Sequence, residues 1–159
     1  IKNRLEFNAL MKLISIKLRE NLREDKGGTY GVGAYNSIQR IPKSEYKVFI
    51  VWGCAPDNVD LLLSAAKEEI AKTKNGLCSI DDLNKVKETL KRDKESAEKT
   101  NSFWVSTLNS YYSSGENQEN YKLYNSYIDA LTPQMMQELA KKYFNDSELK
   151  IFILNPEQP

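Results

Sequence analysis

Arg23 and Tyr30 are the two residues whose types and spacing best suit chemistry on a bound ligand. They flank a tandem-glycine turn, because residues 22–34 read Leu-Arg-Glu-Asp-Lys-Gly-Gly-Thr-Tyr-Gly-Val-Gly-Ala. Each also has an ordinary interpretation. An arginine in a last helical turn is favoured by the helix dipole, and a tyrosine at a strand start is a common β-former. The small residues around them permit another backbone to approach closely, which favours a binding role. A dinucleotide loop is excluded, since that motif places its glycines between a strand and a following helix.

Histidine is absent from the sequence. This excludes Ser-His-Asp and Cys-His catalysis, and it excludes the histidine-bearing zinc sites that most hydrolases use. Two cysteines are present, Cys54 and Cys78, without the C-x-x-C spacing of many metal and redox sites. We expect both to be free thiols and expect no metal ligands in this chain.

The length of 159 residues fits a single domain over 1–159 with its own core. The net charge is +1, from 23 basic and 22 acidic residues, so no overall field favours nucleic acid or an anionic membrane. No apolar run approaches the roughly 20 residues of a membrane-spanning helix. The first residues lack a signal peptide's apolar region and a starting methionine, so we expect a piece of a longer protein.

Hydrophobic periodicity predicts the elements that must position Arg23 and Tyr30. An amphipathic pattern over 5–24 predicts a first helix, ended by the glycines, and β-branched and aromatic residues predict strands over 29–38 and 45–53. The proline-containing segment 40–44 is expected to be the hairpin loop. Ser79 and Thr132-Pro133 are typical helix starts. Further helices are expected over 57–74, from Ser79 to Ala97, over 101–113, over 121–131 and from Pro133, and a last strand over 149–154.

Segregated strands and helices indicate an α+β fold, with a mainly antiparallel sheet and a run of helices packed on one face. The strand over 149–154 is expected to join the hairpin's sheet, because a lone strand leaves its backbone groups unpaired. The first helix begins almost at residue 1, so we expect the sheet to be truncated on its N-terminal side. An exposed strand edge of this kind recruits partners, and a homo-oligomer is one expected consequence.

Three other segments have two interpretations each. The aromatic residues at 103–104 and 111–112 resemble a stacking platform, but helical spacing and neutral charge favour packing in a core or chamber wall. The charged run over 85–95 alternates in sign, as on a solvated helix face. The acidic pairs 68–69 and 81–82 show no pattern that indicates acid–base catalysis.

The segment 22–32 resembles the L-R-E…G-x-x-Y-x-V element in the C-terminal half of pitrilysin-like (inverzincin) zinc peptidases. Two further blocks strengthen the resemblance. Residues 82–88, Asp-Leu-Asn-Lys-Val-Lys-Glu, are similar to the family's E-L-x-x-x-K-E helix. Residues 100–108 are similar to an N-x-F-W-x-x-x-L element of a bacterial branch. Similar segments cover roughly residues 5–145, and their order and spacing make the resemblance fairly specific.

The resemblance implies a metallopeptidase-like domain that does not bind zinc. Family members combine related α+β domains around a closed chamber that takes in unfolded peptides, and the catalytic zinc is held in an N-terminal domain by an H-x-x-E-H helix. This chain would therefore have no cofactor of its own and would be inactive when isolated. Its expected partners are the N-terminal catalytic half of the same protein and unfolded peptide substrates.

By the same resemblance, Tyr30 would be a catalytic contact and Arg23 and Tyr30 would bind substrate. The Tyr30 hydroxyl would hydrogen-bond the developing oxyanion, and Arg23 would hold a substrate carbonyl or backbone group. A phenol suits this role because it is a neutral donor at pH 7, with an ordinary pKa of about 10. The alternative is a non-proteolytic core or scaffold subunit derived from the same fold. The sequence does not identify the cellular compartment, and the resemblance to the bacterial branch suggests the periplasm.

Overall fold

The computed structural model describes residues 2–39, 42–115 and 117–156. In chain order the main elements are α1 (Lys2–Leu18), β1 (Thr29–Gln39), β2 (Glu45–Cys54), α2 (Val59–Lys74), α3 (Ile80–Ala97), α4 (Asn101–Ser114), α5 (Tyr124–Asp129) and α6 (Pro133–Tyr143). A π-helical segment, Arg19–Asp25, continues α1, and short 3₁₀ turns occupy Pro56–Asn58, Gln118–Tyr121 and Asp146–Glu148. This α+β architecture confirms the predicted fold class.

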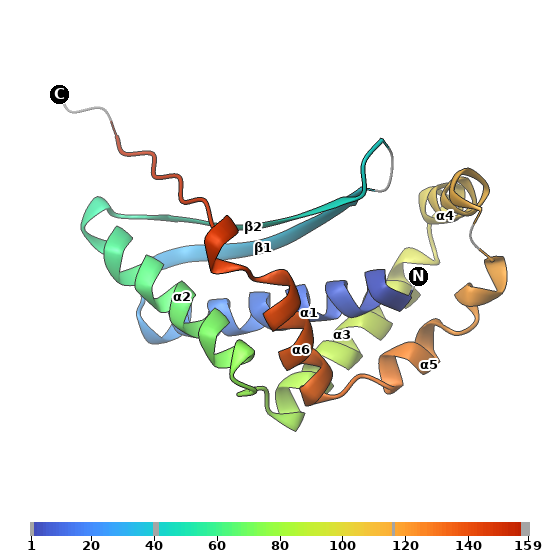
Figure 1. Cartoon of the computed structure of the whole chain (residues 1–159), viewed down its shortest axis with the longest axis horizontal. Helices are drawn as coiled ribbons and strands as arrows, with labels where there is room; N and C mark the ends of the chain where they lie inside the picture. The colour runs from blue at the N-terminus through green and yellow to red at the C-terminus, as the bar shows by residue number, and fades with distance from the viewer. Residues whose placement is uncertain (1, 40–41, 116, 157–159) are drawn as a thin grey trace.

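Helix α1 is the centre of the domain. It contacts β1 on one side and α2, α3, α5 and α6 on its other sides, and the hairpin lies across this helical layer (Figure 1). Most of the apolar residues of α1 are buried, so this helix is covered on more than one side. The buried residues of α1 are Leu5, Phe7, Ala9, Leu10, Met11, Leu13, Ile14 and Leu18.

Hydroxyl caps set the starts of three helices. The Ser79 Oγ accepts a hydrogen bond from the backbone N–H of Asp82 at 3.0 Å, which confirms the predicted helix start at Ser79. The Thr132 Oγ1 caps α6 in the same way, through the N–H of Met135 at 3.2 Å, with Pro133 in the first turn as predicted. Thr100 caps α4.

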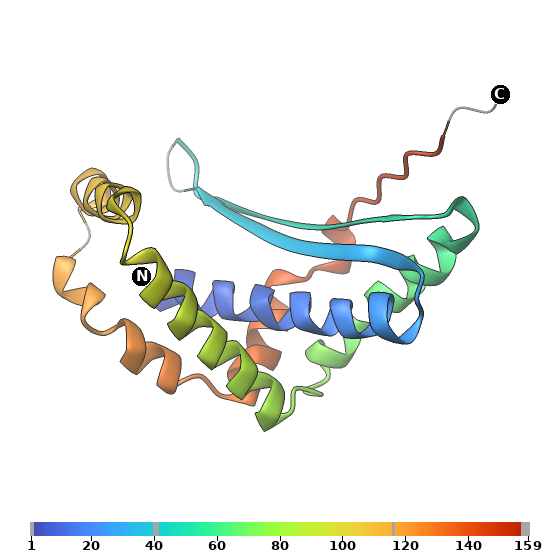
Figure 2. The ribbon, with the colours of Figure 1, turned by 180° about the vertical axis from the view of Figure 1, so that it is seen from behind.

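Strands β1 and β2 form an antiparallel hairpin whose two faces differ. Val32 and Ala34 alternate along β1 with outward-facing residues and pack on the helical core, together with Val48, Ile50 and Trp52 of β2. The helices cover only this inner face, so the outer face of the hairpin is bare in both views (Figures 1 and 2). Of the predicted loop 40–44, residues 40–41 lie outside the described residues.

The predicted strand over 149–154 is wrong. In the described residues the sheet has two strands, β1 and β2, and residues 149–154 are extended without ladder partners. Phe152 is 91% exposed and Leu154 is 100% exposed. The reason is geometric: after the 3₁₀ turn Asp146–Glu148 the chain runs away from β2, so their backbones never align (Figure 1). A strand-like composition favours an extended backbone, but a strand also needs a second backbone beside it to form hydrogen bonds.

Candidate functional site

Arg23 lies on a stretch of π-helix. Residues Arg19–Asp25 follow α1 with wider turns, and the N–H of Lys26 reaches the carbonyl of Asn21 at 3.1 Å, five residues back. A π-helix adds a residue to a turn and so rotates the following side chains relative to the α-helical pattern. The apolar Leu22 of this turn is buried, whereas Arg23 is exposed. The wider turn thus keeps Leu22 in the core while it presents the guanidinium to solvent.

Two glycines then reverse the chain. Gly27 adopts φ +59°, a left-handed conformation that costs other residues free energy, and the N–H of Gly28 closes the helix end on the carbonyl of Leu22 at 3.3 Å. At Gly28 a Cβ atom would lie 2.9 Å from Leu62 Cδ2, and Leu62 is fully buried. The predicted glycine stop is therefore confirmed, and Gly28 also permits β1 to start close against α2.

Tyr30 lies on an irregularity of β1. Thr29 pairs with Cys54 and Val32 pairs with Trp52, so Tyr30 and Gly31 together oppose the single residue Gly53. This extra residue is a β-bulge, a feature that often re-aims a side chain beside an active site. Tyr30 is fully exposed, at 100%. Its hydroxyl has no hydrogen-bond partner among residues 2–39, 42–115 and 117–156, so it is free to donate.

The Thr29 side chain holds the bulge in place. Its hydroxyl donates to the carbonyl of Gly53 at 2.6 Å, across the hairpin, and accepts from the N–H of Gly31 at 3.2 Å. Thr29 is 8% exposed, so these hydrogen bonds are largely shielded from water. Backbone groups that the bulge removes from the ladder are thus paired again, and the direction of Tyr30 is fixed.

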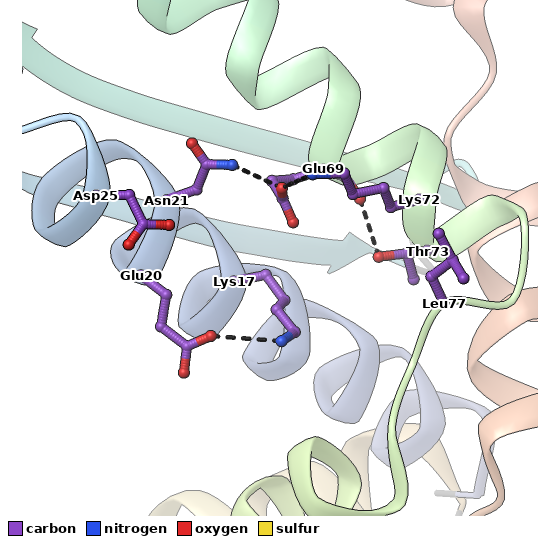
Figure 3. Close-up of a pocket in the computed structure, with 8 residues that line it drawn as sticks. All are labelled: Lys17, Glu20, Asn21, Asp25, Glu69, Lys72, Thr73 and Leu77. Carbon is purple, nitrogen blue, oxygen red and sulfur yellow. Dashed lines mark hydrogen bonds and ion pairs between the residues drawn. The ribbon is translucent and has the colours of Figure 1, made fainter.

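The π-helical turn is tied to α2 by a polar groove. Asn21 Nδ2 donates to Glu69 Oε1 at 2.7 Å, and Lys72 Nζ donates to the same oxygen at 2.7 Å (Figure 3). Glu69 is 7% exposed, and the hydrogen bonds that Lys72 donates to the Glu69 and Glu68 carboxylates raise the pKa of Lys72. No sequence signal predicts this contact, because Asn21 and Glu69 are distant in sequence and neither belongs to a motif. The groove has a structural use: it fixes the turn that carries Arg23.

A second ion pair holds α1 against α3. Lys17 Nζ lies 2.8 Å from Asp82 Oδ2, and the Ser79 hydroxyl donates to the same carboxylate oxygen at 2.7 Å. Burial alone would raise the pKa of Asp82, but the hydrogen bonds from Lys17 and Ser79 outweigh it and hold that pKa below its ordinary value. Asp82 therefore stays charged and structural near neutral pH.

The described residues do not fit a zinc site. Among them no group of three or more cysteine, aspartate or glutamate side chains is placed to hold a metal ion. Cys54 is half-buried and Cys78 is buried, and both are free thiols, as expected. Burial raises the pKa of the Cys78 thiol, which makes it a poorer metal ligand and nucleophile. Within the same residues, no helix is long and apolar enough to cross a bilayer.

The aromatic residues of α4 are only partly core residues. Tyr111 is buried, as predicted, but Tyr112 is 77% exposed and Trp104 is 40% exposed. The Trp104 ring lies tilted against the Tyr121 ring, with centroids 5.5 Å apart, and its Nε1 donates to the carbonyl of Glu98 at 2.8 Å. These contacts anchor α4 to Glu98, just before it in the chain, and to Tyr121, after it, at a distance along the chain from the Arg23–Tyr30 turn.

The chain is similar to known proteins over most of its length. Residues 2–90, more than half of the chain and including Arg23 and Tyr30, match the family described as the peptidase M16 inactive domain. No curated protein matches the chain. Three solved structures share the fold: a protease from Helicobacter pylori (20% identity, TM-score 0.78), the periplasmic protease PqqL from Escherichia coli (20%, 0.68) and a peptidase M16 inactive domain from Pseudomonas fluorescens (17%, 0.70).

These structures are longer than this chain. The chain aligns over 93%, 90% and 87% of its own length, respectively, but spans only 36%, 16% and 34% of theirs. At these identities the alignments describe the fold. The roles of individual residues must come from the local geometry.

Proposed function

Because this chain belongs to the peptidase M16 inactive-domain family, we propose that it is the substrate-contacting, non-catalytic domain of a zinc metalloendopeptidase. The zinc would be held by an N-terminal half of the same protein, since the described residues here offer no ligand set. When bound, the ion would polarise the scissile carbonyl and activate a water molecule. The isolated chain would then bind peptide without hydrolysing it.

In this proposal the Tyr30 hydroxyl donates a hydrogen bond to the oxygen that becomes negative as the peptide bond is attacked. A neutral hydroxyl suits this task, because it stabilises the developing charge by a hydrogen bond while it keeps its proton. Arg23 would hold a carbonyl of the same substrate, since its guanidinium offers several donors in a fixed plane. Both side chains are solvent-exposed, so substrate can reach them.

The observation that carries the proposal is that both residues lie on irregular backbone. Arg23 is on a π-helical turn and Tyr30 is on a β-bulge, with the glycine turn between them. Each irregularity interrupts the regular backbone hydrogen bonding of its element. A side-chain hydrogen bond then holds each in place, from Asn21 at the π-helical turn and from Thr29 at the bulge. Such features concentrate at functional sites because they aim side chains in directions that regular elements cannot.

The lengths of the similar structures support a partner within the same protein. The chain spans about a third of the Helicobacter pylori protease, which leaves room in such proteins for a catalytic half. We therefore propose that this domain faces the N-terminal half of its own protein across a substrate chamber. The peptide would be unfolded, since an extended chain exposes the carbonyl groups that Arg23 and Tyr30 would contact.

Kinetics of the full-length protein test the proposal. Tyr30→Phe removes the hydroxyl and keeps the ring, so kcat should fall on the order of a hundredfold at unchanged zinc content. Tyr112→Phe is the matched control, because Tyr112 is an exposed tyrosine of α4, at 77%, away from the glycine turn and the hairpin in the chain. It should leave kcat unchanged.

Equal turnover of the Tyr30→Phe variant and the parent would remove Tyr30 from the mechanism. The sequence upstream gives an independent outcome. If the N-terminal half lacks an H-x-x-E-H helix, no catalytic zinc site can form there. The alternative of a non-proteolytic scaffold subunit then replaces this proposal.

A further inference from the structure

The outward face of the hairpin carries exposed apolar side chains that the proposed mechanism does not use. Tyr35 is 63% exposed, Phe49 51% and Val51 57%. In the antiparallel register Tyr35 pairs with Phe49 and Gly33 pairs with Val51, so these four residues are neighbours on one face. We call them the apolar strip. No helix covers this side of the hairpin in the part of the chain that the structure describes (Figures 1 and 2).

Glycines lie between the apolar strip and Tyr30, so no side chain covers the backbone at Gly31 and Gly53. The Tyr35 ring leans over Gly33, where a Cβ atom would lie 2.5 Å from the ring. At Gly31 and Gly53, by contrast, a Cβ atom would meet nothing within 4 Å. Gly53 is the residue that faces the bulge. A ligand backbone can therefore approach closely between Tyr30 and the strip, as glycines in strands often allow.

The charge of this face selects the kind of ligand. None of the four strip residues is charged, and the next outward pair is Ser37 with Lys47. The Lys47 ammonium is already 2.9 Å from the Glu45 carboxylate. A charged side chain placed on the strip would lose hydration without gaining a partner, which costs free energy. Apolar side chains would gain free energy from the same contact.

We propose that the apolar strip is a subsite for an extended stretch of unfolded polypeptide and binds an apolar or aromatic side chain. This rests on the proposed function, with the scissile peptide bond at Tyr30. Gly31 and Tyr35 are four strand positions apart, or about 14 Å at the usual rise of about 3.4 Å per residue. An extended substrate rises by a similar amount, so the preferred side chain is about four residues from the scissile bond.

Peptide binding by the 159-residue chain tests the subsite. The probe is a short fluorescein-labelled glycine–serine peptide that carries two leucines, and its matched control has serines in their place. Fluorescence anisotropy should give tighter binding for the leucine peptide. Phe49→Ser should weaken that binding about fivefold, since Phe49 still has about half of its surface to bury. Gly53→Val should also weaken it, because the new side chain fills the approach to the backbone.

Leu61→Ser is the matched control variant, because Leu61 is also 51% exposed but lies on α2. It should leave binding unchanged, and circular dichroism should show every variant folded. Equal affinity for both peptides, or an unchanged affinity in Phe49→Ser, contradicts the subsite. A dimer that Phe49→Ser converts to monomer contradicts it too, because a second copy would then be the occupant. Unaltered turnover of Tyr30→Phe in the full-length protein would refute the mechanism alone and leave this binding result standing.

Discussion

Replacement of Thr29 by valine tests whether the bulge is held as the structure indicates. Valine keeps the shape and the β-propensity of threonine but lacks the hydroxyl. The variant therefore loses the 2.6 Å hydrogen bond to the Gly53 carbonyl and leaves the N–H of Gly31 without its acceptor at 3.2 Å. Because Thr29 is 8% exposed, water replaces these partners only partly.

The expected loss is about 1–3 kcal/mol in the free energy of unfolding, the range for leaving shielded polar groups unpaired. Urea denaturation followed by circular dichroism at 25 °C measures it. Thr73→Val is the control: Thr73 is 3% exposed, but its hydroxyl donates at 3.1 Å to the Glu69 carbonyl within α2. That carbonyl lies inside the helix and keeps its helical backbone hydrogen bond, so this substitution should cost less than about 1 kcal/mol.

A Thr29→Val variant within about 0.5 kcal/mol of the parent would refute the reasoning, as would an equal loss in Thr73→Val. The same substitution in the full-length protein should lower turnover at constant zinc content, because Tyr30 is then no longer aimed by the bulge. A displacement of about 1 Å can cost on the order of a hundredfold in rate.

Two further predictions concern the elements around the site. Gly28→Ala should lower the free energy of unfolding by about 1–3 kcal/mol, because its Cβ would lie 2.9 Å from the buried Leu62. Gly31→Ala is the control, since the space at its Cβ is open, and it should stay within about 0.5 kcal/mol of the parent. Equal losses in urea denaturation of the two variants would contradict this. Asp82 has a lowered pKa in the fold, so its contribution to stability is present above the ordinary carboxyl value of about 4 and is lost as the pH falls through the folded value. The stability difference between the parent and Asp82→Asn should therefore shrink as the pH is lowered from neutral into that range, and a pH-independent difference would show that the pairing with Lys17 does not set it.

Local signals in the sequence predicted most of the fold. The caps at Ser79 and Thr132 and the glycine stop after the first helix depend on short-range geometry, and the structure confirms them. The family match likewise confirms the resemblance to the non-zinc-binding domain of pitrilysin-like peptidases. These signals need only a few neighbouring residues, which is why a single sequence carries them.

The failures depend on contacts between distant segments. The segment 149–154 has the composition of a strand, but a strand forms only where another backbone is aligned beside it. The hydrogen bond between Asn21 and Glu69 joins two elements whose relative position no local pattern encodes. The π-helical turn and the β-bulge also leave no signal in the sequence, because each adds only one residue to an otherwise regular helix or strand.

Arg23 and Tyr30 are both exposed, and their roles in substrate binding and catalysis stay predictions. The most direct test is the affinity of the full-length protein for a phosphinic peptide, whose tetrahedral phosphinate mimics the oxyanion. If the Tyr30 hydroxyl stabilises that charge, Tyr30→Phe should weaken inhibitor binding on the order of a hundredfold, in step with the fall in kcat/KM. An inhibitor that binds the variant as tightly as it binds the parent, at equal zinc content, would contradict the account.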